Sequence, residues 1–411
     1  MRRPLIKVLR KALTIVAVVA AAGVLAVELL FAALWLEHNS PLELPRPTGP
    51  FAVGRISTTW TDTARMDPFA PPPARPRELV VWIWYPAQRS ARAQTAEYLP
   101  GPWRRALAKH AGVLLTHFLF RDPTKVRCHS VENAGLAQAS RSYPVVIFRS
   151  GIGALAFQYT TLVEDLASHG YIVVSADTPY STSVVVMPDG RVIQRTIKGN
   201  PGDAPISQDE RVRLTRSLIG VWTADTRFLL DQVARMNEDD PSGKLTGKMN
   251  LDAVGIAGHS LGGATAAQFC HDDSRCRAGI DIDGQLFGRV REGMGQPFLF
   301  LLSDHGDVWA SPDCRICAEI RSTAKRAPRD KLIVTMLGAH HFSFGDQALT
   351  QSRILRSALV TISGQGGLDP RTGLESTCRY VRELFDVHLR GAPRKALYSA
   401  PLVAGVRFER K

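Results

Sequence analysis

The sequence predicts an α/β protein with a mostly parallel central sheet flanked by helices and preceded by one N-terminal transmembrane helix. Short apolar runs alternate with amphipathic segments from residue 79 onward, as expected for a parallel sheet covered by helices. A long apolar stretch, residues 12–36, lies near the N-terminus. With 45% hydrophobic and 22% charged residues among 411, the chain has the composition of a folded globular protein.

The N-terminal segment, residues 1–36, predicts a cytoplasmic flank and a membrane anchor. Basic residues are concentrated in 1–11, whereas Glu28 is the only charged residue in 12–36. A helix rises about 1.5 Å per residue, so 12–36 is long enough to cross roughly 30 Å of hydrocarbon. It exceeds the apolar core of a signal peptide, about 7 to 15 residues, so we favour a retained anchor over a cleaved signal or a buried helix. The basic flank predicts a single-pass protein with its main domain on the extracytoplasmic side, or a secreted protein if the segment is cleaved.

Proline is dense in residues 37–76, which predicts an extended linker between the anchor and the main domain. The domain itself is expected over 77–411. Within it, residues 179–250 are long for a crossover and are interpreted as an insertion that either covers the active site or forms a surface loop. The six cysteines include two close pairs, Cys270/Cys276 and Cys314/Cys317, whose spacing permits local disulfides in an oxidising compartment.

The strands of the domain are predicted from near-continuous apolar runs, which are typical of strands buried on both faces. These runs are 79–85, 145–148, 171–176, 254–257, 278–282, 298–302 and 332–336. Helical periodicity marks residues 159–168, 210–236, 261–270 and 375–389. One catalytic domain built on one sheet follows from this alternation.

The motif Gly258-His259-Ser260-Leu261-Gly262-Gly263 carries the strongest chemical signal. It directly follows the apolar run 254–257 and directly precedes a helix rich in small residues. This is the strand–turn–helix context of a nucleophile elbow, in which glycines relieve clashes in a sharp turn and the serine hydroxyl is exposed. We therefore expect Ser260 to be the nucleophile of an α/β-hydrolase fold.

A serine hydroxyl needs a general base and an orienting carboxylate, which in this fold follow in the order serine, acid, histidine. His340 or His341, in the loop after the run 332–336, is the expected base, rather than His271, His305 or His388. Asp283 ends one predicted strand, while Asp304 and Asp307 follow the next; Asp281 lies inside a strand. From the residues alone, Asp283 and Asp304 remain open.

An oxyanion hole requires two backbone N–H groups, one from the residue after the nucleophile and one from a loop after an earlier strand. Leu261 supplies the first. The loop Gly151-Ile152-Gly153 follows the run 145–148, and its glycines allow a close approach of the backbone, so it is expected to supply the second.

Taken together, collinear segments between Leu79 and Asp346 resemble the secreted and type II platelet-activating-factor acetylhydrolases. They are Val81 to Pro86, Pro144 to Phe148 with Gly151 to Ala154, Asp165 to Val173, Gly258 to Thr265, Gly279 to Asp283, and His341 with Phe344 and Asp346. The resemblance implies Ser260, Asp283 and His341 as the catalytic triad, and the amides of Ile152 and Leu261 as the oxyanion hole. It thereby favours Asp283 over Asp304.

The chain departs from the family pattern at two places. Arg149-Ser150-Gly151 stands where the family usually reads Ser-His-Gly, so a histidine that buttresses the loop is missing. Residues 179–250 show little likeness, which leaves the acyl and headgroup preference open.

The expected function is serine-dependent hydrolysis of carboxylic esters, with short-acyl or oxidised phospholipids as candidate substrates. A general carboxylesterase or a polyester-cleaving lipase would use the same residues, and a non-catalytic binding protein tethered to the membrane is the alternative from another class. No metal or other cofactor is expected, because the triad alone supplies acyl-transfer chemistry. The net charge of +13 includes no basic block interleaved with aromatics, so no nucleic-acid partner is expected either.

Overall fold

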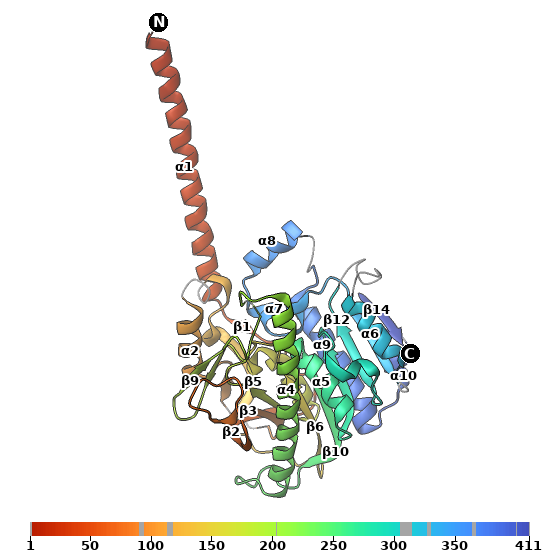
Figure 1. Ribbon diagram of the computed structural model, residues 1–411. Helices are drawn as coiled ribbons and strands as arrows, with labels where there is room; N and C mark the ends of the chain where they lie inside the picture. Colours follow the sequence, from red (N-terminus) through yellow and green to blue (C-terminus); the bar gives the residue numbers. More distant parts are fainter. Residues whose placement is uncertain are drawn as a thin grey trace.

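The computed structural model describes residues 2–89, 94–112, 118–202, 204–304, 315–326, 330–363, 367–399 and 401–410. One large mixed sheet has the strand order β1-β5-β2-β3-β7-β6-β10-β11-β12-β13-β14, with β4 paired to β5 (Figure 1). The central neighbours from β7 to β13 all pair in parallel, whereas β2, β3 and β14 add antiparallel strands at the two sides. The predicted mostly parallel sheet is therefore confirmed.

The apolar runs of the sequence correspond to the central strands. Their bounds are β3 (Pro76–Ala87), β6 (Tyr143–Arg149), β7 (Ile172–Asp177), β10 (Met249–His259), β11 (Cys276–Ile282), β12 (Phe298–Leu302) and β13 (Lys331–Met336). The further strands are β1 (Leu42–Glu43), β2 (Ala52–Met66), β4 (Thr95–Glu97), β5 (Val126–Glu132) and β14 (Val406–Arg410), with a separate hairpin of β8 (Val184–Val186) and β9 (Val192–Gln194).

Helices cover both faces of the sheet. One face carries α2 (Gly101–Ala111), α3 (Thr160–Ser168), α9 (Pro370–Arg390) and α10 (Lys395–Ser399); the other carries α4 (Gln208–Glu238), α5 (Leu261–Asp272) and α6 (Arg315–Arg326). Further helices are α7 (Gln347–Thr350) and α8 (Arg353–Ser363), with 3-10 turns η2 (Pro123–Lys125), η3 (Ala156–Tyr159), η4 (Gly288–Glu292) and η6 (His341–Phe344).

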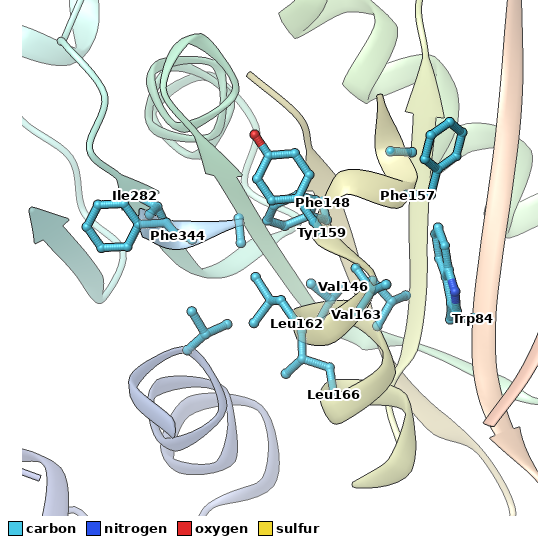
Figure 2. Packing of buried hydrophobic residues seen from close by; sticks show 14 of the residues in the cluster. Trp84, Val146, Phe148, Phe157, Tyr159, Leu162, Val163, Leu166, Ile282 and Phe344 are labelled. Atoms are coloured by element: carbon cyan, nitrogen blue, oxygen red, sulfur yellow. The ribbon is translucent and has the colours of Figure 1, made fainter. Parts of the chain in front are cut away.

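Strand β6 shows how the two faces share the core. Val146 and Phe148 point to the layer under α3 and α9, while Val145 and Ile147 point to the layer under α4 and α5. Each is fully buried, which explains why the strand reads as an unbroken apolar run. Figure 2 shows the first layer, in which the two β6 side chains lie beside those of α3: Leu162, Val163 and Leu166.

The predicted linker over 37–76 is wrong for its central part. Residues 52–66 form β2, which pairs antiparallel with β3 and parallel with β5. The prolines of this region lie before and after β2 and none lies within it. Their average density therefore concealed a run rich in β-branched residues that pairs well in a sheet.

The N-terminal helix α1 (Arg2–His38) projects from the body of the protein (Figure 1). Its segment Arg10–His38 is long and apolar enough to cross a membrane, with a mean hydropathy of 2.6 in its most apolar window and none of that window buried. Its last turns contact the domain: Leu34 is 5% exposed and His38 is 8% exposed.

A disulfide joins Cys270, near the end of α5, to Cys276 at the start of β11. This is one of the two pairs that the spacing permits. Cys314, of the other pair, lies outside the described residues.

Candidate active site

The turn between β10 and α5 presents Ser260. Its backbone has φ 56° and ψ −123°, a region that side chains other than glycine rarely occupy. The strained geometry aims the side chain out of the end of the strand, and the serine is only partly buried. This is the elbow that the motif predicts.

The glycines of the motif are required by close backbone contacts. A Cβ atom on Gly258 would lie 2.2 Å from the carbonyl oxygen of Gly262, and one on Gly262 would lie 2.2 Å from the carbonyl oxygen of Arg149. Both contacts are far shorter than van der Waals separation and both partners are backbone. The G-x-S-x-G spacing is therefore a packing requirement of this turn.

His341 connects Ser260 to Asp283. Its Nε2 lies 3.0 Å from Ser260 Oγ, and its Nδ1 lies 2.7 Å from Asp283 Oδ2. The Asp283 carboxylate also accepts hydrogen bonds from the backbone N–H and the hydroxyl of Ser303, both at 2.8 Å to Oδ1. Its side chain is 5% exposed against 40% for His341, so a buried acid holds a ring that remains accessible.

Asp304, the alternative acid, has a different position. Its Oδ2 accepts a hydrogen bond from the Gly338 N–H at 2.8 Å, and its own N–H donates to the Ala339 carbonyl at 2.9 Å. It therefore braces the turn after β13 that leads to His341. Asp307 lies outside the described residues.

Asp281, a further candidate acid, is buried inside β11. Its Oδ1 accepts from the Gly284 N–H at 2.9 Å, and its Oδ2 has no hydrogen-bond partner among the described residues. Burial, and then the charge of Asp283, raise the pKa of Asp281 well above its ordinary value. Burial therefore favours the neutral form of this carboxyl group.

The other histidines have separate partners. His340 accepts a hydrogen bond from the Phe342 N–H at Nδ1, His271 Nδ1 is 2.7 Å from the Gly293 carbonyl, and His388 Nε2 is 2.7 Å from the Tyr398 hydroxyl. His305 lies outside the described residues.

The loop after β6 presents the amide of Ile152. None of the hydrogen bonds of the described residues uses that N–H, whereas the flanking groups are engaged. The Ala154 N–H donates to Gly151 O at 3.0 Å and the Ser183 N–H donates to Gly153 O at 3.0 Å. The other expected amide, that of Leu261, opens α5 and so has no acceptor within its own helix.

Two aromatic side chains that sequence reasoning did not assign support this arrangement. His259 is buried between Tyr159 and the His341 backbone: its Nδ1 is 2.8 Å from the Tyr159 hydroxyl and its Nε2 is 2.8 Å from the His341 carbonyl oxygen. Burial, and next the proximity of His341, lower the pKa of His259 to about 3. It stays neutral at physiological pH and ties the elbow to the His341 loop.

The residue at position 150 indicates that the loop must be supported by another side chain. The family's buttressing histidine is absent there, and the Ser150 hydroxyl is buried without a hydrogen-bond partner among the described residues. The Tyr159 hydroxyl accepts the Gly151 N–H at 3.3 Å instead. The loop is thus supported from η3.

The family of the chain follows from a match to the model of platelet-activating factor acetylhydrolase, isoform II, over residues 37–184 and 232–389. The chain belongs to this family. The family match leaves out residues 185–231, which include most of α4. The resemblance read from the sequence is confirmed.

Two relatives and a solved structure agree with this membership. A probable 1-alkyl-2-acetylglycerophosphocholine esterase from Arthroderma benhamiae is 27% identical over 62% of this chain and 64% of that protein, slightly under two thirds of its length. The platelet-activating factor acetylhydrolase of Bos taurus is 25% identical over 78% of this chain and 72% of that protein. A ferulic acid esterase from Streptomyces cinnamoneus superposes with a TM-score of 0.72 at 25% identity, covering 90% of this chain and 99% of the other. The α/β-hydrolase fold is confirmed.

Proposed function

We propose that the protein is a serine ester hydrolase in which Ser260, His341 and Asp283 form the catalytic triad. The observation that supports this most strongly is the continuous hydrogen-bonded path from Ser260 Oγ through the His341 ring to Asp283, with distances of 3.0 and 2.7 Å. The same arrangement allows a weak nucleophile to lose its proton as it attacks.

The reaction begins when Ser260 Oγ attacks the ester carbonyl carbon and His341 Nε2 takes the hydroxyl proton. The carbonyl electron pair moves to oxygen, where the N–H groups of Ile152 and Leu261 stabilise the negative charge. Collapse of this intermediate breaks the bond to the alcohol, which leaves with the proton from His341. Water then repeats the sequence on the acyl-enzyme and releases the acid. Asp283 holds the tautomer in which Nδ1 carries hydrogen.

The substrate class that we propose is carboxylic esters, including phospholipids with short or oxidised acyl chains. The names of the fungal and bovine relatives support this choice, since the first describes an esterase of 1-alkyl-2-acetylglycerophosphocholine and the second an acetylhydrolase of platelet-activating factor. A general carboxylesterase activity is the second candidate, and the ferulic acid esterase neighbour favours it.

The test is labelling of the full chain in detergent with a fluorophosphonate probe, with Ser260→Ala as the matched variant. We expect wild type to be labelled and the variant to remain unlabelled, and wild type to hydrolyse p-nitrophenyl acetate. A folded wild-type protein that neither reacts with the probe nor cleaves the ester would support the binding-protein alternative.

We further propose that α1 is a retained single-pass anchor with the catalytic domain on the extracytoplasmic side. Supporting this, the Glu37 carboxylate near the end of α1 accepts hydrogen bonds from the Ser352 hydroxyl at 2.6 Å and the Arg353 N–H at 2.9 Å. The end of the helix is thereby bonded to the domain. Full-length protein should stay in the membrane fraction after alkaline extraction, and recovery of a shortened chain from the medium would indicate cleavage instead.

A further inference from the structure

The hydrogen-bond partners of His259 determine which of its ring nitrogen atoms carries hydrogen. Its Nε2 lies 2.8 Å from the His341 carbonyl oxygen, which can only accept, so Nε2 is the donor. Its Nδ1 therefore accepts, and the Tyr159 hydroxyl, 2.8 Å away, donates its hydrogen to it. The Tyr159 oxygen in turn accepts the N–H of Gly151 at 3.3 Å. The result is one directed chain of hydrogen bonds, whose members are Gly151, Tyr159, His259 and His341.

The two ends of this chain of hydrogen bonds lie on different parts of the proposed catalytic machinery. At one end, the Gly151 N–H immediately precedes the amide of Ile152 in the loop after β6. At the other end, the acceptor is the backbone of His341, the proposed general base. The contacts between the ends are close, since a Cβ atom on Gly151 would lie 3.2 Å from His259 Nδ1 and 3.3 Å from Ser260 Cβ. The chain of hydrogen bonds therefore connects the loop of the oxyanion hole to the base beside the nucleophile elbow.

The side chains of Tyr159 and His259 are held by packing as well as by these hydrogen bonds. They are 3% and 5% exposed, and the Tyr159 ring lies 4.9 Å from the Phe148 ring of β6, measured between centroids (Figure 2). The His259 ring lies next to the His341 ring, with centroids 4.6 Å apart and an interplanar angle of 37°. In such a closely packed site, a shift of either side chain would displace the ring that accepts the serine proton.

We propose that Tyr159 and His259 are positioning residues that act as one unit and set the distance between the oxyanion hole and His341 Nε2. This inference rests on the proposed ester hydrolysis at Ser260. In the transition state, the oxyanion donors and the base must both lie within hydrogen-bond reach of the reacting atoms. A displacement of about 1 Å at either place can cost about 10²-fold in rate. The role requires no contact with substrate, so its loss should lower kcat rather than weaken binding.

The experiment measures kcat and KM for p-nitrophenyl acetate in full-length wild type, Tyr159→Phe, His259→Leu and the double variant. Each single change should lower kcat and kcat/KM by the same factor, about tenfold or more, as expected for an interaction that matters only in the transition state. The double variant should lose no more than the worse single variant, because both changes break the same chain of hydrogen bonds. His259→Gln should lose less than His259→Leu, since its side-chain amide can still donate to the His341 carbonyl.

Tyr143→Phe is the matched control for the loss of a buried tyrosine hydroxyl. Tyr143 is 2% exposed, and its hydroxyl donates to the Ala137 carbonyl at 2.9 Å. It lies at the start of β6, whereas Gly151 follows the end of that strand. The control should therefore keep the kcat of wild type.

Fluorophosphonate labelling of wild type separates failure of this inference from failure of the proposed function. If wild type is not labelled, the proposed function fails and this inference falls with it. If wild type is labelled, three results would refute the positioning pair: folded variants that keep the kcat of Tyr143→Phe, single losses that multiply in the double variant, or losses confined to a higher KM. If His259→Leu does not fold, His259→Gln takes its place beside Tyr159→Phe, and their double variant should again lose no more than the worse single variant.

Discussion

Two regions next to the elbow at Ser260 differ in how they are built. On one side Ser260, His341 and Asp283 leave the ends of β10, β13 and β11 and are joined by hydrogen bonds. On the other, α4 presents tightly packed apolar side chains and a tryptophan under a buried arginine. The first side depends on specific atoms at specific distances, so few residue types can form it. The second depends on shape and volume, which many sequences can supply. The catalytic residues are therefore recognisable from motifs here, whereas the packing of α4 is not.

The largest expected effect is on the triad side. Asp283→Asn should lower kcat by about 10⁴, because the amide no longer stabilises the His341 tautomer that accepts the serine proton. Asp304→Asn is the matched control: its carboxylate bonds the Gly338 N–H, and an amide oxygen can still accept that bond. Steady-state kinetics on an activated ester measure both. A larger loss of kcat in Asp304→Asn would identify Asp304, which follows β12, as the acid of the triad. It would contradict the assignment of Asp304 as a residue that only braces the turn.

The next effect concerns how the α4 side is attached to the sheet. Arg77 of β3 forms buried ion pairs with Asp225 of α4 at 2.8 Å and with Asp67 at 2.7 Å. Asp225→Asn should lower the free energy of unfolding by about 3 to 5 kcal/mol, because it leaves a buried guanidinium without its main counter-charge. Asp231→Asn, on the same helix but in an exposed pair with Arg275, should cost at most about 1 kcal/mol. Denaturant titration compares the two. Equal small losses would mean that α4 is held by apolar contacts alone.

The smallest expected effect is a pH dependence of the free energy of unfolding, which arises from Asp177 at the end of β7. Asp177 accepts hydrogen bonds from the Ala156 N–H and the Trp82 indole, both at 2.8 Å, yet burial raises its pKa to about 7. The folded state therefore binds a proton that the unfolded chain has lost above about pH 4. Stability should fall as pH rises from about 4 to about 7, with the full loss present above pH 7.

Asp177→Asn removes this dependence while keeping an acceptor for the Ala156 N–H. As the pH rises from 5 to 8, the free energy of unfolding of the variant should increase relative to that of wild type. Denaturant titration at both pH values measures this change. A difference between the two proteins that does not change with pH would show that Asp177 ionises alike in the folded and unfolded chains.

Much of the central sheet was predictable because its strands are buried on both faces. Strand β12 coincides with its apolar run, and β6 and β13 differ from theirs only at the ends. Strand β2 was missed because half of its residues are polar and it lies between proline clusters. The position of β2 in the sheet is set by pairing with two strands. One is β5, which is remote in sequence, and the other is β3, from which a proline-rich turn separates it.

The candidate site, too, was predictable from the sequence only in part. The sequence by itself determined Ser260 and the two histidines after β13, because a sharp turn demands glycines and acyl transfer demands a base at a fixed place in the chain order. It left Asp283 and Asp304 equal on chemical grounds, since both follow neighbouring strands. The resemblance favoured Asp283, but only the tertiary structure shows that this carboxylate lies 2.7 Å from the His341 ring and that α4 packs in one cluster with Leu261. Those outcomes depend on strand register and on packing between distant segments, which no local pattern encodes.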